Sequence, residues 1–199
     1  MAKPKEIQLP QPIKKSQMSV EEAILKRRSV RSFMQKPLDW VQIGQILWAA
    51  QGITAQKWGF NFRATPSAGA LYPMEIYVVS KDGLFHYLPL EHKLEVLSNS
   101  DLRVSLTQAA FNQDPISQAP VDIVICAVYR RVTGKYSSRG IRYVHIEAGH
   151  LAQNIHLQAV SLGLGSVPIG AFDDEQVKDV LSLPAEHEPL YIIPVGYPQ

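Results

Sequence analysis

Residues 142–171, RYVHIEAGHLAQNIHLQAVSLGLGSVPIGA, constrain the fold more than any other stretch of this sequence. Apolar residues recur there at spacings of three and four, which predicts an α-helix over residues 142–162; they are Val144, Ala148, Leu151, Ile155, Ala159 and Leu162. A second set of apolar or small residues, including Ile146 and Gly149, predicts that this helix is buried on more than one side. Gly163 fits the left-handed residue that ends many helices. We therefore expect a long core helix that leads into a glycine-opened loop whose amides face a ligand.

Helices and strands follow one another along the rest of the chain without strict alternation, which favours an α+β fold. Helices are predicted at residues 19–27, 37–52, 102–111 and 173–181, and strands at residues 75–79, 84–88, 121–129 and 189–197. Residues 53–69 resemble a loop, and the basic residues 130–140 are expected to form a mobile loop. Residues 1–18 are aperiodic and contain several Pro and Lys residues, which predicts an extended arm that either wraps a partner subunit or is loose. Residues 19–199 are then expected to form one domain.

Composition argues against several classes of protein. Hydrophobic residues make up 46% of the chain and charged residues 19%, an ordinary balance for a globular protein. The net charge of +2 is too small to indicate a nucleic-acid partner. No apolar run reaches the length of a membrane span, and the N-terminus lacks the apolar core of a signal peptide, so a cytoplasmic protein is the default expectation. The single cysteine, Cys126, lies in an apolar run and is expected to be a buried structural thiol.

A basic motif, RRSVR at residues 27–31, follows the first predicted helix. Arginine binds phosphate through a planar fork of donors, and a serine hydroxyl adds a neutral donor. A solvated basic surface is the alternative interpretation. Phe33 directly after the motif weakens that alternative, because it suggests that the segment turns inward.

Three further motifs each allow two interpretations. Ser67 and Gly69 precede a predicted strand and suit either a close approach to a ligand or an ordinary turn. Lys135–Tyr136 is either a proton-transfer pair or two adjacent surface residues. Glu147 and His150 have the spacing of a metal-binding helix, but a hydrogen bond on the helix face is favoured and no metal is expected. Neither a dinucleotide-binding fingerprint, a nucleophile elbow nor a Walker A motif is present, which disfavours Rossmann and P-loop enzymes.

Taken together, three stretches resemble the nitroreductase superfamily, and within it the SagB-type, azoline-oxidising branch. They are RRSVRSF, PSAGALYPMEIYVV and EAGHLAQNIHLQAVSLGLGSVPIGAF, and the resemblance extends over roughly residues 19–197. It implies an α+β nitroreductase-like fold with a central, mostly antiparallel sheet flanked by helices and a long buried core helix. It also implies an FMN-dependent oxidoreductase that forms an intertwined homodimer with two flavins at the interface.

The resemblance assigns roles to particular residues. Arg27, Arg28, Ser29 and Arg31 match the segment that holds the FMN phosphate and ribityl chain. Pro66, Ser67, Ala68 and Gly69 match the segment along the flavin, and Pro168, Ile169, Gly170 and Ala171 match the segment whose amides face the flavin N5 and O4 edge. Lys135 and Tyr136 match the Lys–Tyr pair implicated in azoline oxidation.

The implied reaction is hydride transfer through flavin N5 between a reduced donor such as NAD(P)H and a small organic acceptor. An azoline-type dehydrogenase that uses Lys135 and Tyr136 is one alternative, and a non-catalytic flavin carrier or sensor is another. Two departures from the family pattern are expected to matter. The sequence stops at Gln199 without the basic residue that contacts phosphate in many members, and it lacks the extra N-terminal domain of peptide-modifying dehydrogenases.

Overall fold

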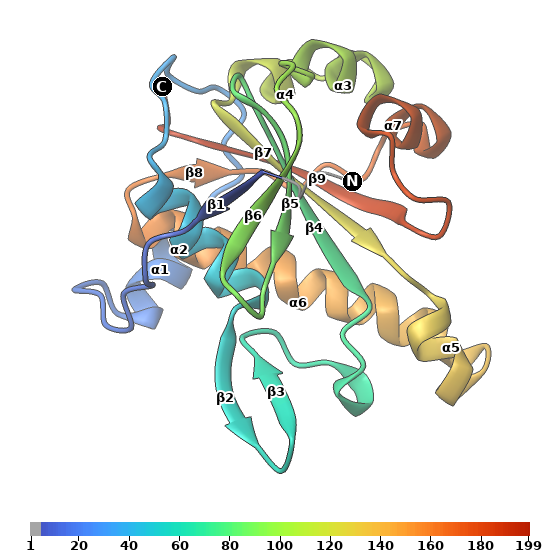
Figure 1. Cartoon of the computed structure of the whole chain (residues 1–199). Coiled ribbons are helices and arrows are strands. Elements are labelled where there is room, and N and C mark those ends of the chain that lie inside the picture. The colour runs from blue at the N-terminus through green and yellow to red at the C-terminus, as the bar shows by residue number, and fades with distance from the viewer. Residues whose placement is uncertain (1–4) are drawn as a thin grey trace.

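A computed structural model describes residues 5–199 of the chain, and residues 1–4 of the predicted arm lie outside the described residues. Its centre is a seven-stranded sheet in which every neighbouring pair of strands is antiparallel (Figure 1). In spatial order the strands are β1 (Glu6–Gln8), β6 (Lys93–Ser98), β5 (Gly83–Leu88), β4 (Met74–Ser80), β7 (Val121–Ala127), β9 (Glu188–Gly196) and β8 (Gly165–Ser166). The predicted α+β fold with a central antiparallel sheet is confirmed.

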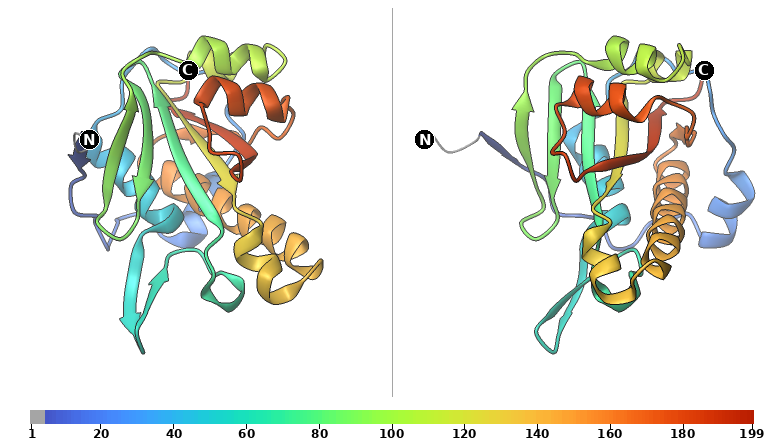
Figure 2. Two further views of the ribbon diagram at one scale, coloured as in Figure 1. Left: turned by 45° about the vertical axis from the view of Figure 1, so that its right-hand side comes forward. Right: turned by 90° about the vertical axis from the view of Figure 1, so that its right-hand side faces the viewer.

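Strand β7 shows why the sheet separates two cores. All seven of its residues are buried, and its side chains alternate between the faces, as strand geometry requires. Ile123 and Ile125 belong to one core, whereas Val124 and the free thiol of Cys126 belong to the other. The first face is covered by helices α2 (Trp40–Gln51) and α6 (Arg139–Ser161) (Figure 2). The second face is covered by helices α3 (Arg103–Ala109), α4 (Asp114–Gln118) and α7 (Asp174–Leu181).

Helix α6 is the predicted core helix, and it begins three residues earlier than the sequence pattern indicates. Its 23 residues give a length of about 35 Å. The inner face, which includes Val144 and Leu151, is fully buried. At its end, Leu164 donates to the Ala159 carbonyl (2.8 Å) and Gly163 has φ of +72°, which completes a left-handed cap.

The second apolar face predicted for α6 is not buried within the chain. Ile146 is 48% exposed, and Gly149 lies on the same exposed side. Ala148, Gly149 and Ala152 are small residues that lie close together in the sequence. Of these three, Ala148 and Ala152 pack inside the core. The small residues therefore belong to two different faces, because positions 148 and 152 follow the inner stripe of the helix and position 149 does not.

Local capping fixes the start of three other helices. Two of them begin within one residue of the predicted position, whereas α2 begins at Trp40, three residues after the predicted start at residue 37. Helix α1 (Val20–Lys26) follows Ser19, whose hydroxyl accepts from the Glu22 amide (3.1 Å). Helix α2 begins after Asp39, which forms a capping box with Gln42, and α7 begins after Asp173. A side-chain oxygen that satisfies a free amide of the first turn needs only neighbours in sequence.

Two predictions of loops are wrong. Residues 53–69 contain a hairpin, β2 (Ile53–Lys57) and β3 (Phe60–Arg63), followed by the 3₁₀ turn η1 (Ala68–Ala70). The hairpin projects from the body of the molecule (Figure 1), and its two turn residues, Trp58 and Gly59, both have positive φ. Tight hairpin turns take that geometry, but Trp is an uncommon residue for it, and this is why the turn is hard to recognise.

The second wrongly predicted loop, residues 130–140, forms helix α5 (Arg130–Tyr136) and the start of α6. Only Val132 of α5 is buried, so the sequence carries no apolar stripe that would reveal a helix. Tertiary contacts hold it instead. Arg131 donates to the Tyr72 carbonyl (3.0 Å) and forms an ion pair with Glu75.

The described part of the predicted arm lies against the domain of its own chain. Strand β1 pairs with β6 at the sheet edge, and Leu9 is buried. Further along, the Gln45 side chain exchanges hydrogen bonds with both backbone groups of Ile13 (2.7 and 3.0 Å).

Candidate functional site

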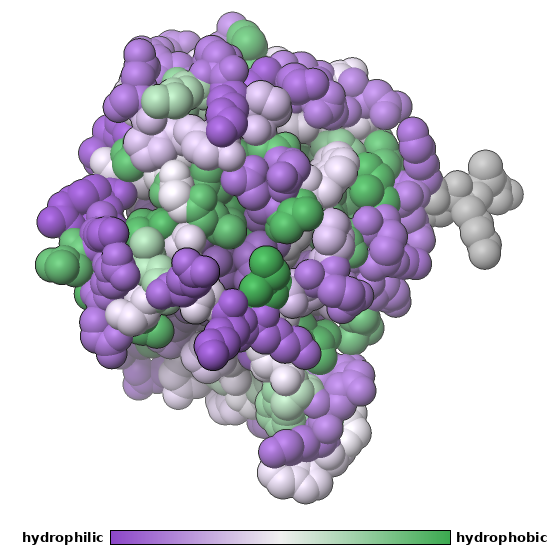
Figure 3. Space-filling model, turned by 90° about the vertical axis from the view of Figure 1, so that its left-hand side faces the viewer, coloured by the Kyte–Doolittle hydropathy of each residue, from purple (hydrophilic) through white to green (hydrophobic). Residues whose placement is uncertain are grey.

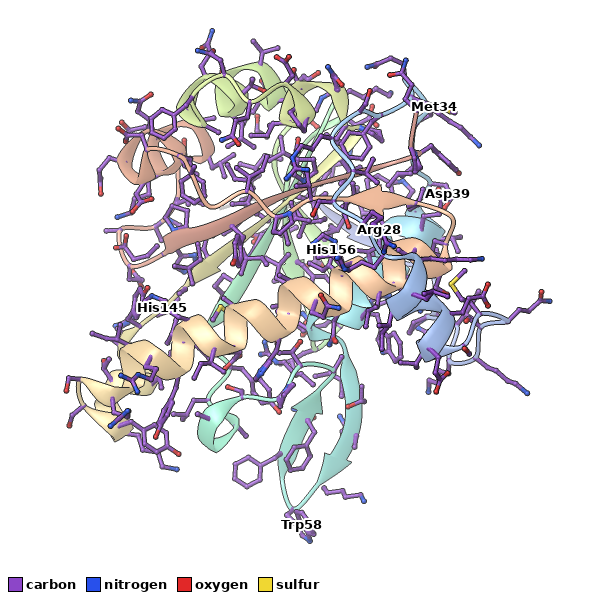
Figure 4. All side chains as sticks on the ribbon, turned by 180° about the vertical axis from the view of Figure 1, so that it is seen from behind. Arg28, Met34, Asp39, Trp58, His145 and His156 are labelled. Carbon is purple, nitrogen blue, oxygen red and sulfur yellow. The ribbon has the colours of Figure 1, made fainter. Side chains whose placement is uncertain are left out.

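The arginine segment, residues 27–31, lies directly beside strand β8. Ser29 forms a parallel bridge with Ser166, and the Val30 amide donates to the Ser166 carbonyl (3.0 Å). Gly165 permits this approach, because a Cβ at that position would lie 2.5 Å from the Val30 side chain. Residues that are far apart in sequence thus form one continuous surface at the C-terminal end of α6, where Arg28 and His156 lie close together (Figure 4).

The three guanidinium groups of this segment are engaged differently. Nη1 of Arg28 donates to the carbonyls of Leu25 (2.9 Å) and Arg27 (2.7 Å), so Arg28 helps to cap α1. Arg27 and Arg31 form no ion pair with any acidic side chain in residues 5–199. Two cations beside exposed Ser29 are therefore left for an external anion.

The amide segment, residues 168–171, continues from β8 along the same edge. The Ile169 amide is used within the fold, since it donates to the Ile192 carbonyl (2.8 Å). Gly170 and Ala171 are exposed, and their amides donate no hydrogen bond within the described part of the chain. Gln113 fixes the end of the segment by donating to the Ala171 carbonyl (2.7 Å). The predicted ligand-facing amides are therefore free.

The turn segment, residues 66–69, is anchored on the other side of α6. Thr65, which precedes it, is buried; its hydroxyl donates to the Ala50 carbonyl (2.7 Å) and lies 3.2 Å from Nδ2 of Asn154. The Ser67 hydroxyl accepts from the Tyr72 amide (2.9 Å), which closes the turn. Gly69 has φ of +64°, a conformation that glycine adopts readily and other residues rarely do.

Lys135 and Tyr136 meet the turn segment at Gly69. A Cβ placed on Gly69 would lie 2.8 Å from Tyr136 Oη and 3.1 Å from Lys135 Nζ. The Tyr136 ring is half-buried and packs edge-on against Tyr143, with 5.2 Å between ring centroids. The two adjacent residues therefore form part of one structural unit with the turn segment.

The structure thus groups the predicted site residues into two half-sites. The first contains the arginine and amide segments, and the second contains the turn segment with Lys135 and Tyr136. Ser166 contacts His156 of α6, and Ser67 lies beside Glu147 of the same helix. Those two helix positions are nine residues apart, which is about 14 Å along the axis. No backbone hydrogen bond within residues 5–199 joins the segments of one half-site to those of the other.

Each half-site rests on a buried ionisable side chain that sequence reasoning missed. Burial, with the positive charge of Arg27, lowers the pKa of His156 to about 4, and its Nδ1 lies 2.6 Å from Ser166 Oγ. Burial raises the pKa of Glu147 to about 7, against the polar side chains of Ser67 and Gln51 and the charge of Arg63, which lower it. The hydrogen bond predicted between Glu147 and His150 is absent, because Glu147 faces the core and His150 faces outward.

A cleft of about 380 Å³ opens next to the second half-site, and the charged groups along it include Arg63, Glu75, His86 and Arg131. Burial raises the pKa of Glu75, but hydrogen bonds from His86 and Arg131 outweigh burial and bring it to about 2. Glu75 therefore stays ionised and fixes Arg131, which in turn holds helix α5. The cleft is also lined by Leu71 and Tyr72, which directly follow the turn segment.

Membrane-spanning helices and metal-binding clusters are both absent from residues 5–199. No helix there is both long and apolar enough to cross a membrane. No group of three or more His, Cys, Asp or Glu side chains in those residues is arranged to hold a metal ion.

Comparison with known proteins gives one consistent family. The family model described as the nitroreductase family matches residues 24–197. A relative from Methanocaldococcus jannaschii, named as a nitroreductase, is 41% identical over 197 residues, which cover 96% of each chain. The crystal structure of a protein named as a nitroreductase from Ralstonia eutropha superposes with a TM-score of 0.88 at 31% identity, and covers 98% of this chain and 90% of its own.

Two more distant relatives carry more specific names. The microcin B17-processing protein McbC of Escherichia coli is 28% identical over 133 residues, which are 61% of this chain and 48% of McbC. The FMN reductase of Bacillus subtilis, named with NAD(P)H, is 24% identical over 193 residues, which are 90% of this chain and 66% of the reductase.

Proposed function

The chain belongs to the nitroreductase family, and from this premise we propose that it is an FMN-dependent oxidoreductase. The observation that carries the proposal is the bridge between Ser29 and Ser166. It places the cationic arginine segment and the free amides of the amide segment on one edge of the molecule. A ligand with an anionic phosphate at one end and a planar polar ring at the other requires this arrangement. We take residues 19–199 as the FMN-binding domain.

The residues present fit FMN at each of its chemical groups. Arg27 and Arg31 have no acidic partner within residues 5–199 and would pair with the phosphate, to which Ser29 would donate. The free amides of Gly170 and Ala171 would donate to the polar edge of the ring and stabilise negative charge there. The left-handed Gly69 lets the turn segment lie flat, without a side chain between it and the ligand. When bound, FMN supplies the hydride chemistry at N5.

A homodimer is the assembly that we propose. Large apolar side chains are exposed on α6, as Ile146, and on α1, as Ile24 and Leu25, the last at 72%. Apolar patches also lie between polar ones on the side of the molecule seen in Figure 3. A second copy that covers such surface would also bring its own half-sites close to those of the first. The support for dimerisation thus comes from these exposed residues, since Ala148 and Ala152 already pack within one chain.

A reduced nicotinamide nucleotide is the donor class that we propose, because the Bacillus subtilis relative is named as an FMN reductase with NAD(P)H. The acceptor is a small organic molecule. A specific observation favours a second candidate function, the azoline-type dehydrogenation of the SagB branch. Lys135 and Tyr136 contact the turn segment at Gly69, where a proton donor or acceptor would reach a substrate on the flavin.

The experiment that tests the proposal measures flavin binding and flavin reduction separately. FMN is added to purified protein while its fluorescence is followed, and NADH or NADPH is then added anaerobically while the absorbance is followed. Quenching of FMN fluorescence followed by bleaching of the flavin band is the expected result. Protein that leaves FMN fluorescence unchanged would overturn the proposal. Protein that binds FMN but gives no turnover with any donor and acceptor would instead be a flavin carrier or sensor.

A further inference from the structure

The side chain of Glu147 is buried beneath the turn segment with unsatisfied hydrogen-bonding capacity. It is 2% exposed, and its Oε1 atom has no hydrogen-bond partner within the described residues. Nε2 of the neighbouring Gln51 is likewise buried and unpartnered. More than nine in ten buried polar groups in proteins have a partner, so two adjacent exceptions need an explanation. A structure that only required packing would place apolar side chains here.

Glu147 stands at the centre of a network that joins three segments. The side chains of Ser67 and Gln51 are the polar groups nearest in influence to its carboxyl, and both lower its pKa. Arg63 donates from Nη1 to Gln51 Oε1 (3.1 Å) and from its amide to the Tyr72 hydroxyl (3.1 Å), while the Tyr72 amide donates to Ser67 Oγ (2.9 Å). Helix α2, strand β3 and the turn segment are therefore hydrogen-bonded to one another around one carboxyl group on α6.

Direct contact between Oε1 and a ligand is ruled out by its burial, since the atom is inaccessible even though the half-site above it is open. His150, the other half of the E-x-x-H spacing, is exposed on a different side of α6. Any influence of Glu147 on a bound ligand must accordingly pass through Ser67.

We propose that Glu147 is a positioning residue whose change between the neutral and the ionised form moves the turn segment and thereby sets the geometry of the second half-site. This inference rests on the proposed flavin function, and it deepens it by naming how that site is regulated. In the neutral form one carboxyl oxygen carries the proton and donates, so that only the other oxygen is left to accept. In the ionised form it accepts hydrogen bonds from Gln51 and from the Ser67 hydroxyl at once, and it attracts Arg63.

The surroundings of Glu147 place this change near neutral pH. Burial raises its pKa to about 7, and Ser67, Gln51 and then Arg63 act in the opposite direction. Arg63 is the charged group that faces it from β3, and Arg63 is itself flanked by Glu75 and Arg131. Gln51 faces it from α2, Ser67 and Tyr72 from the turn, and Lys135 and Tyr136 of α5 meet the same turn at Gly69. A carboxyl with an ordinary pKa would remain ionised and could not act as a switch.

The first test observes the turn segment itself, by ¹⁵N NMR of the Tyr72 amide in protein without FMN. That amide donates to Ser67 Oγ, so its chemical shift is expected to titrate with a midpoint near pH 7 in the wild type and to stay constant in Glu147→Gln. Ser67→Ala keeps the carboxyl but removes the link, and should also abolish the titration. A Tyr72 amide that is unaffected by pH in the wild type, or that titrates in Glu147→Gln as in the wild type, would overturn the inference.

The second test asks whether the switch reaches the ligand, by measuring the FMN dissociation constant of wild type and Glu147→Gln between about pH 6 and pH 8. Because the FMN phosphate titrates in the same way with both proteins, the ratio of the two dissociation constants does not depend on that titration. Because the ionised carboxylate draws Ser67 towards itself and so moves the turn segment away from the ligand, the ratio of wild type to variant should rise with pH, by about fivefold between about pH 6 and pH 8 if FMN raises the pKa by about one unit. Glu175→Gln, which removes a carboxylate that is 81% exposed, is the control and should follow the wild type.

The outcomes of the two tests separate the inference from the function on which it rests. A ratio that stays constant across the pH range would show that Glu147 only packs against the turn, and would overturn its role in the site. Wild-type protein that binds no FMN at any pH would overturn the proposed function, and the Tyr72 titration would still decide whether Glu147 moves the turn segment.

Discussion

Gly69 and Tyr136 touch across the second half-site, and the fit leaves no room for a side chain at position 69. A Cβ there would lie 2.8 Å from the Tyr136 hydroxyl oxygen, and the φ of Gly69 is +64°. Position 69 is thus restricted twice, by its own backbone conformation and by its neighbour. The two restrictions can be separated by experiment because Gly163 carries only one of them.

Gly69→Ala is expected to destabilise the protein and to displace Tyr136. A left-handed backbone costs a residue with a Cβ about 1–2 kcal/mol, and the contact with Tyr136 adds to that cost. Gly163→Ala is the matched control, since Gly163 has φ of +72° and a Cβ added there would meet nothing within 4 Å. Thermal unfolding of both variants measures the difference. Equal losses of stability would show that Tyr136 yields to the new methyl group at no cost.

Removal of Arg27 or Arg31 by substitution with Ala is expected to weaken FMN binding about ten- to hundredfold. A hydrogen bond to a charged phosphate contributes about 1.5–3 kcal/mol, and neither arginine has an acidic partner that would compensate within residues 5–199. Riboflavin, which lacks the phosphate, should bind to wild type and variants equally. Lys81→Ala removes a positive charge remote from both half-sites and is the control. Unchanged FMN affinity in both arginine variants would refute the phosphate assignment.

Lys135→Ala and Tyr136→Phe are expected to retain FMN. If the enzyme is a Lys–Tyr dehydrogenase, both variants should oxidise substrate about 10²–10⁴-fold more slowly, because a positioned proton-transfer group contributes that much. If the enzyme only passes hydride to nitro compounds or quinones, turnover should change little. Tyr143→Phe keeps the ring that packs against Tyr136 and serves as the control. Loss of FMN from these variants would mean that the pair holds the cofactor instead.

Substitution of Asp122 by Asn is expected to stabilise the protein, and more so as the pH rises. Both carboxyl oxygens of Asp122 are buried without a partner in the described residues, and burial raises its pKa well above the ordinary value despite the attraction of Arg103. The folded state therefore binds this proton more tightly than the unfolded state does. Stability falls as the pH rises above the ordinary aspartate pKa towards the raised one.

The measurement for Asp122 is the melting temperature of wild type and Asp122→Asn across the pH range from about 5 to 9. The advantage of the variant should grow towards alkaline pH. Asp179→Asn, at an exposed position of α7, should give no such trend. A constant difference at every pH would show that the Asp122 carboxyl has the same pKa in the folded and unfolded states, as a solvated carboxyl does.

The proposed homodimer predicts that sedimentation gives twice the 22.2 kDa mass of the chain at micromolar concentration. Ile146→Asp places a charge on the exposed face of α6 and should dissociate the dimer. Val104→Asp changes an equally exposed apolar residue on the opposite side of the sheet, in α3, and should leave it intact. A wild-type monomer with FMN bound would contradict the proposal.

Features that depend on neighbours in sequence could be predicted, and features that depend on distant contacts could not. Ser19 and Asp39 cap helices through bonds that span three residues, and Gly163 ends α6 by its own conformation. Helix α5 carries one buried apolar residue and is held by the distant Glu75, so the local pattern resembles a loop. The family motifs named the segments of the site, but they could not show that these form two groups along α6.

Glu147 illustrates the same limit at the scale of one side chain. Its spacing to His150 suggested a shared role, whereas its actual partners, Gln51 and Ser67, lie about a hundred positions earlier in the chain. Burial, which gives the carboxyl its raised pKa, is a property of the folded surroundings. Its place three residues after Val144 and four before Leu151 put it on the apolar stripe of the helix, but that pattern could not identify its partners.

Residues 32–34, which directly follow the arginine segment, are hydrogen-bonded to Tyr197 and Gln199, and this affects the order of folding during synthesis. The Met34 amide donates to the Tyr197 carbonyl (2.9 Å), and the Ser32 hydroxyl lies 2.8 Å from Gln199 Oε1, across 167 positions. When residues 27–34 leave the ribosome, Tyr197 and Gln199 have not yet been translated. Closing so long a loop is entropically costly, and contacts of high sequence separation form slowly. A nascent chain should therefore acquire its phosphate-binding edge only once residues 197–199 have emerged.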